Sequence, residues 1–126
     1  MKNTIISFML FFSVLAFVIY SNNTLVKFCN KTLELSDEIE IFICEEKWKE
    51  SYEKSLELKS VISEKFPSIS IYINHTDMDN LNIEILKLTQ YVKEEDSAEG
   101  LATLHIIKCY AEYMKELQEI NIINIL

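Results

Sequence analysis

The sequence predicts an all-α protein in which an N-terminal transmembrane helix leads into an antiparallel up-down-up-down helical bundle. Three observations carry this prediction. The 126 residues include one glycine and one proline, so the chain lacks the residues that usually form turns and strand bends. A long uncharged run lies near the N-terminus. Beyond it, apolar residues recur at spacings of three and four, which is the pattern of amphipathic helices.

Residues 4–20 (TIISFMLFFSVLAFVIY) contain no charge and would span ~26 Å as a helix. This approaches the ~30 Å hydrocarbon core of a bilayer, so we expect residues 1–23 to form a membrane anchor and the protein to be a single-pass protein of the cell membrane. Two alternatives are a cleaved signal peptide, for which no small-residue cleavage site follows, and a buried helix of a soluble protein.

The positive charges on the two sides of the anchor are nearly equal, so they do not decide on which side of the membrane the bundle lies. Lys2 and the terminal amine precede the anchor, while Lys27 and Lys31 follow it. Because the anchor begins at the N-terminus, like an uncleaved signal, we expect the bundle to lie outside the cytoplasm. Residues 34–126 contain nine lysines and twenty acids, a net charge of −11. Such a domain should repel nucleic acids, and also anionic lipids except near Lys27 and Lys31.

Four helices are expected within residues 24–119. The first, 24–43, continues from the anchor with a stripe formed by Phe28, Thr32, Leu35, Ile39 and Phe42. The second, 45–66, has Glu45 and Glu46 in its first turn and ends before Pro67, which disfavours helical geometry in the preceding residue. Its apolar positions are Trp48, Tyr52, Ser55 or Leu56, Leu58 and Ile62.

The third helix, 69–93, carries a strong stripe of Met78, Leu81, Ile85, Leu88 and Val92, although Ile69, Ile71 and Ile73 would also suit a short strand. The fourth, 97–119, begins with Ser97 as its N-cap and has Gly100 in its first turn. Its apolar arc comprises Leu104, Ile106, Ile107, Tyr110, Ala111, Tyr113, Met114 and Leu117. Short connections force antiparallel neighbours, so the 66–73 turn and the apolar tail 120–126 should lie near the bilayer, with the 93–96 turn far from it.

The tail INIINIL has two interpretations. It can be a last helical turn that packs under the bundle. It can instead contact lipid or a membrane partner, or add as a strand to the sheet edge of another protein. On the second interpretation, Ile122 and Ile125 are candidate partner-binding residues. Trp48 and His75 are further candidates, although a residue in the core or at its edge is the simpler explanation of Trp48.

Few residues suggest chemistry. His75 and Asp79 share one helical face and could hold a divalent ion, although a histidine at the boundary of the apolar arc is the simpler explanation of His75. His105 and Cys109 also have ligand spacing, without a second pair to support them. The three cysteines are an odd number. Cys29 and Cys44 lie too far apart on one helix to bridge, and a pair between Cys44 and Cys109 has no support, so we expect unpaired thiols that act as small hydrophobes.

The sequence contains no glycine-rich phosphate loop, nucleophile elbow, HExxH or CxxC motif. We therefore expect no enzymatic activity, no cofactor and no small-molecule substrate.

Three short motifs carry a resemblance to a known family. They are Glu46–Trp48, the His-x-Asp-x-Asp stretch at 75–79 and Asn124–Ile125. With the N-terminal anchor, they make the chain resemble a family of short proteins of unknown function from low-GC, often spore-forming anaerobic bacteria. The resemblance covers nearly the whole length and implies an anchored helical domain with no established activity.

Two functions follow as hypotheses. In the first, the acidic helical domain binds or stabilises an integral membrane partner. In the second, it is an envelope sensor or a ligand- or metal-binding module that uses the flank formed by His75 and Asp79.

Overall fold

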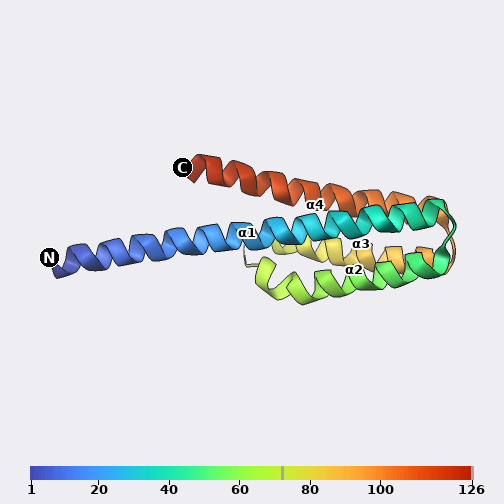
Figure 1. Ribbon diagram of the computed structural model, residues 1–126, viewed down its shortest axis with the longest axis horizontal. Helices are drawn as coiled ribbons and strands as arrows, with labels where there is room; N and C mark the ends of the chain where they lie inside the picture. The colour runs from blue at the N-terminus through green and yellow to red at the C-terminus, as the bar shows by residue number, and fades with distance from the viewer. Residues whose placement is uncertain (72, 126) are drawn as a thin grey trace.

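The computed structural model describes residues 1–71 and 73–125, without the side chains of Asn121, Ile122 and Ile125. It contains four helices: α1 (Lys2–Cys44), α2 (Trp48–Ile69), α3 (His75–Lys93) and α4 (Ser97–Ile125) (Figure 1). No strand occurs within the described residues, so the all-α prediction is confirmed.

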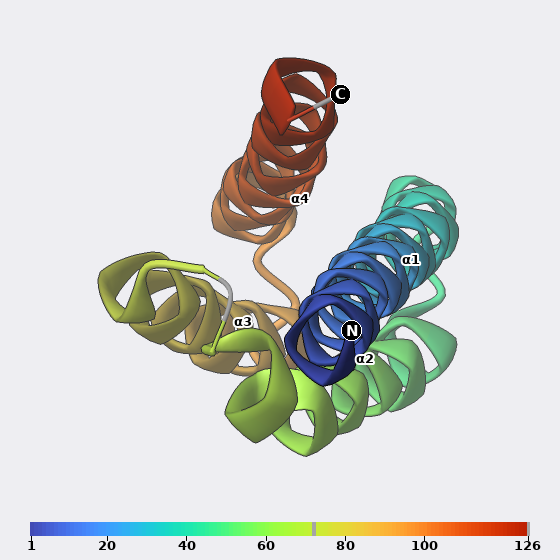
Figure 2. The same ribbon diagram turned by 90° about the vertical axis from the view of Figure 1, so that its left-hand side faces the viewer.

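The helices alternate in direction along one common axis (Figure 1). Each helix packs against the next in the chain, and α4 packs back against α1. Figure 2, which looks from the end that carries the N-terminus, shows α1 beside α2 and α4 above α3. This is the predicted up-down-up-down bundle, and it places the α2–α3 turn at the same end as the N-terminal part of α1.

The first helix has two parts with different surroundings. Its N-terminal part carries no charge over residues 4–20 and projects from the bundle, with the side chains of Phe8, Phe12 and Phe17 more than half exposed. From Ser21 onwards it buries one stripe, which ends at Ile43. Among the described helices, α1 alone is long and apolar enough to cross a membrane, which makes it a candidate anchor continuous with the bundle.

The α1–α2 and α3–α4 turns, at the end of the bundle away from the N-terminus, have the same backbone geometry. Glu46 and Glu95 both have a φ of 57°, in the left-handed region. The next residue in each case donates its N–H five residues back, from Lys47 to Phe42 and from Asp96 to Tyr91. This is the Schellman arrangement, in which glycine usually occupies the left-handed position. Glu45 and Glu46 therefore form a turn, and the prediction that they begin α2 is wrong.

The second helix continues past its proline. Pro67 was expected to end the helix at Phe66, but α2 extends to Ile69. The N–H of Ser70 still donates to the carbonyl of Phe66 at 3.0 Å, and Ile69 is fully buried. Burial of Ile69 therefore maintains a last turn that proline alone would destabilise.

One helix start and one helix cap also differ from the prediction. The third helix begins at His75, not near residue 69, because the Asn74 side chain accepts a hydrogen bond from the Thr76 N–H at 3.0 Å. Ile71 lies in the preceding turn and is exposed, so no strand forms there. In α4 the capping side chain is Asp96, which accepts from the Glu99 N–H at 3.1 Å, and not Ser97.

The core is a single cluster to which all four helices contribute. The five stripe residues predicted for the third helix are all buried, and in α2 the inward position is Ser55, while Leu56 is 40% exposed. Trp48 and Tyr52 pack against the cluster at its edge. Such a core leaves the outer faces of the helices to determine what the bundle can bind.

Candidate partner-binding surface

The apolar arc of α4 is wider than the core can cover. Its inner half, which includes Leu104, Ile107 and Met114, is buried. Its outer half forms a second stripe at the same spacing, which we call the outer stripe: Ile106, Tyr110, Tyr113, Leu117 and Ile120. Four of these side chains are 40–54% exposed, and Tyr110 is partly buried against the core.

Charged residues connect one side of α4 to α1. Lys108 Nζ lies 2.7 Å from Asp37 Oδ1 and also binds Glu40. Glu40 Oε1 in turn lies 3.2 Å from His105 Nε2. These four residues form the α1–α4 ion-pair cluster. Because they bind the polar side of α4 to α1, the outer stripe is directed away from α1.

The electrostatics of the cluster follow from these contacts. The hydrogen bond from Lys108, followed by the one from His105, lowers the pKa of Glu40 below its ordinary value. Burial lowers the pKa of Lys108, but its hydrogen bonds to Asp37 and Glu40 outweigh burial and raise that pKa overall. The fold thus favours the charged forms of both groups, as expected of a structural ion pair.

The outer stripe runs towards the candidate anchor. Figure 1 shows that α4 extends beyond the α2–α3 turn, on the side where α1 projects, and that it diverges from α1 there. Glu119 is the last charged residue of α4, and the exposed side chains of Ile120 and Ile123 follow it. The end of α4 is therefore both uncharged and uncovered.

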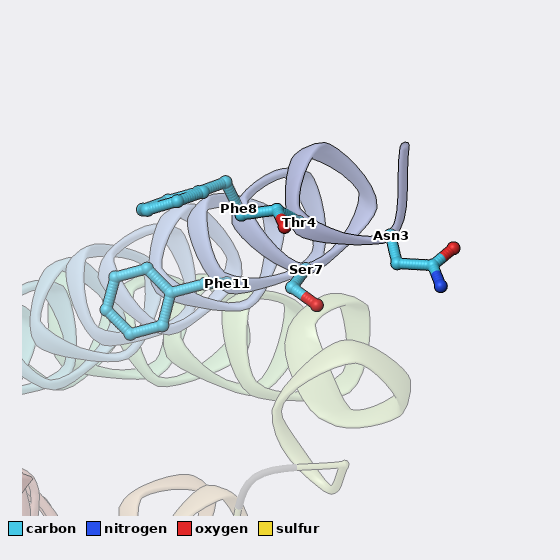
Figure 3. A pocket seen from close by; sticks show the side chains of 5 residues that line it. All are labelled: Asn3, Thr4, Ser7, Phe8 and Phe11. Carbon is cyan, nitrogen blue, oxygen red and sulfur yellow. The ribbon is translucent and has the colours of Figure 1, made fainter. Parts of the chain in front are cut away.

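Two hollows lie on single helices. One, formed by His105, Ile106, Cys109, Tyr110 and Tyr113, follows the outer stripe. The other lies near the start of α1, and Figure 3 shows that its five lining side chains, among them Phe8 and Phe11, all come from that helix. Because no second element encloses either hollow, each offers a surface for an apolar partner and not a cleft for a small ligand.

The residues predicted for partner or metal binding do not form one site. Trp48 is the first residue of α2, at the end of the bundle far from the candidate anchor, whereas His75 is the first residue of α3, at the near end. His75 Nε2 lies 3.8 Å from Asp79 Oδ2, both side chains are exposed, and the ring of His75 packs edge-on against Phe66. The His75–Asp79 pair stays a hypothesis for a ligand sensor.

The other candidate residues also lie in separate places. Ile122 and Ile125 belong to the last turns of α4, and their side chains lie outside the described residues. His105 binds Glu40. Cys29, Cys44 and Cys109 are all free thiols, with Cys29 buried and the other two exposed. Within the described part of the chain, no group of three or more His, Cys, Asp or Glu residues is placed to hold a metal ion.

Sequence reasoning missed the ion-pair cluster and the division of the α4 arc. No local pattern links Glu40 to Lys108, which lies 68 residues away. The width of the arc was a usable signal, because a helix on the surface of a bundle needs only a stripe of ≳100° for its core.

Comparison with known proteins adds a family and no activity. No curated protein and no solved structure matches the chain. A family model described as a domain of unknown function, DUF4363, matches residues 19–125. The match includes the last residues of the apolar run and all the helices of the bundle, in agreement with the family resemblance noted from the sequence. The chain belongs to the DUF4363 family.

Proposed function

We propose that this protein is a non-enzymatic single-pass membrane protein whose bundle binds and stabilises an integral membrane partner through the outer stripe of α4. The observation that carries the proposal is the exposed stripe of Ile106, Tyr113, Leu117 and Ile120. Helical anchors at this spacing are a common means of recognition between helices.

The occupant we propose for the stripe is a helix of a membrane protein. Helix α4 extends past the α2–α3 turn, on the side where the candidate anchor projects, and it carries no charge after Glu119. A soluble partner would not require the helix to stay uncharged at its end nearest the candidate anchor. A transmembrane helix that emerges from the bilayer would meet apolar side chains along the whole stripe.

The proposed setting places residues 4–20 in the bilayer and the bundle outside the cytoplasm. The support for the anchor is its length, its lack of charge and its exposure on every side. The exposed thiols of Cys44 and Cys109 test the side. A membrane-impermeant thiol reagent added to intact cells should label both, and labelling only after lysis would place the bundle in the cytoplasm.

Two neighbouring substitutions test the partner. Tyr113 and Glu112 are both exposed, but only Tyr113 belongs to the outer stripe. Tyr113→Lys should remove an integral membrane protein that otherwise copurifies with the full chain in mild detergent. Glu112→Lys, which introduces the same side chain one position away, should retain it. Recovery of the chain alone, or only with further copies of itself, would contradict the proposal.

Stability is the necessary control for this comparison. Both variants should unfold at the temperature of the unmodified protein, because each changes an exposed side chain. Equal loss of the partner from both variants would show that charge in general, and not the outer stripe, determines the interaction.

A further inference from the structure

We propose that the hollow between α1 and α2, next to the end of the candidate anchor, binds the phosphate headgroup of an anionic phospholipid. The hollow measures about 470 Å³ and is lined by Tyr20, Thr24, Lys27, Phe28 and Lys31 from α1 and by Val61, Glu64 and Lys65 from α2. Two helices form it, unlike the hollows on α1 and α4 alone.

Charge is the first argument. Three lysines and one glutamate line the hollow, whereas residues 34–126 as a whole carry a net charge of −11. Lys31 has a partial partner in Glu34, at 3.6 Å with both side chains exposed. Among the described residues, neither Lys27 nor Lys65 takes part in an ion pair. The hollow is thus a local site for an anion on an acidic protein.

Depth is the second argument. Lys27 follows Tyr20 by seven residues, which places it ~10 Å further along a helix axis. The headgroup layer of a bilayer adds ~5–8 Å beyond the hydrocarbon on each side, and a lysine side chain can reach back towards it. The ammonium groups of Lys27 and Lys65 would then lie at the level of the lipid phosphates, close to the interfacial ring of Tyr20.

The lining also fits a lipid better than a free phosphate. Phe28 and Val61 supply apolar surface within the hollow, and below it the exposed apolar side chains of residues 4–20 would follow the acyl chains. Lys65 joins the site only because α2 returns antiparallel to α1, which brings together residues far apart in the sequence. A phosphodiester with attached chains uses both parts of this surface.

The test uses the full chain in micelles of a neutral detergent. Phosphatidylglycerol should raise the thermal unfolding temperature and stay bound in native mass spectra, and phosphatidylcholine should do neither. Lys27→Gln with Lys65→Gln should weaken binding of phosphatidylglycerol by about fivefold per lysine. Lys59→Gln, on α2 but outside the lining, should bind as the unmodified protein does, and Lys65→Arg should retain binding.

Three results would overturn the proposal: equal binding of the two lipids, equal weakening by Lys59→Gln, or full occupancy by inorganic phosphate without lipid. The last result would assign the site to a soluble phosphate. The inference rests on the proposed anchoring by residues 4–20 but not on the partner of α4. Membrane fractionation of the unmodified protein separates the two, because equal binding of the two lipids with retained anchoring refutes only the lysine site.

Discussion

Replacing Gly100 with alanine should stabilise this protein, although Gly100 is its sole glycine. The residue is buried in the first turn of α4, where its N–H donates to the Asp96 carbonyl at 2.9 Å, and its φ is not positive. A Cβ added there would lie 3.6 Å from Ile43 Cδ1, an ordinary van der Waals distance. The backbone and the packing therefore both accept a methyl group.

The magnitude follows from two contributions. Alanine is favoured over glycine by ~0.8–1.0 kcal/mol within a helix. The buried methyl against Ile43 adds up to ~0.8 kcal/mol. Because Gly100 lies in the first turn and the contact is one-sided, we expect a net gain of about 1 kcal/mol in the free energy of unfolding. For a domain of this size, that gain corresponds to a rise of ~4–8 °C in Tm.

Thermal unfolding of the full chain in mild detergent, followed by far-ultraviolet circular dichroism, measures the effect. Ala98→Gly, at an exposed position in the same turn, is the matched control and should lower Tm through helix propensity alone. Gly100→Val should lose the gain, because its second branch crowds Ile43. A lower Tm for Gly100→Ala would refute the reasoning, since it would mean that α1 and α4 cannot accept even one methyl group.

Three further predictions use other features of the bundle. Since the pKa of Glu40 is lowered in the folded protein, its carboxylate stabilises the fold above its unfolded pKa of ~4.3, and this contribution is lost as the pH falls through the folded value. In chemical denaturation, Glu40→Gln should lower the free energy of unfolding by about 1 kcal/mol near neutral pH and should make that free energy fall less steeply at acidic pH. An unchanged fall at acidic pH would contradict the assignment. Burial raises the pKa of the Cys29 thiol to about 12. A thiol reagent should therefore modify the two exposed cysteines of the folded protein at once, and Cys29 only when the protein unfolds. Rapid labelling of all three cysteines in the folded protein would contradict this. Glu95→Gly should raise Tm, because the left-handed φ of 57° costs glutamate ~1 kcal/mol and costs glycine none of it. A fall in Tm would show instead that the Glu95 side chain stabilises the turn.

The sequence predicted the bundle because its strongest signals are periodic. The stripe from Met78 to Val92 has spacings that only a helix can bury on one side, and all five of its members are buried. The continuity of α1 was also predictable, because nothing between residues 20 and 24 breaks a helix. These features depend on local composition alone.

The helix ends were less predictable because they depend on contacts. Proline at position 67 disfavours a helix locally, yet the burial of Ile69 extends α2 through it. Ser97 was expected to cap α4, but the carboxylate of Asp96 does so. The first case depends on a tertiary contact, which no pattern along the chain reports. In the second, Asp96 and Ser97 are both common N-cap residues, and the structure shows which of them caps the helix.

The candidate surfaces required the fold for the same reason. Lys65 joins Lys27 only through the antiparallel return of α2, and Lys108 reaches Glu40 only through the return of α4. Sequence reasoning could identify the wide apolar arc of α4. It could not determine which half of the arc faces outward, because that depends on how α4 packs against α1 and α3.

The uneven distribution of charge along the axis of the bundle favours an orientation in which this axis is perpendicular to the membrane. The hollow with its three lysines lies next to the candidate anchor, while the turns at Glu45–Lys47 and Glu94–Asp96 place five acids and one lysine at the opposite end. An anionic bilayer would attract the first end and repel the second. Because α1 passes from the anchor into the bundle as one helix, tilting the bundle onto the membrane would require α1 to bend and would bring those acids towards the lipid phosphates. In the proposed setting, the continuous helix and the charge asymmetry therefore favour the same orientation, in which the uncharged end of α4 faces the bilayer.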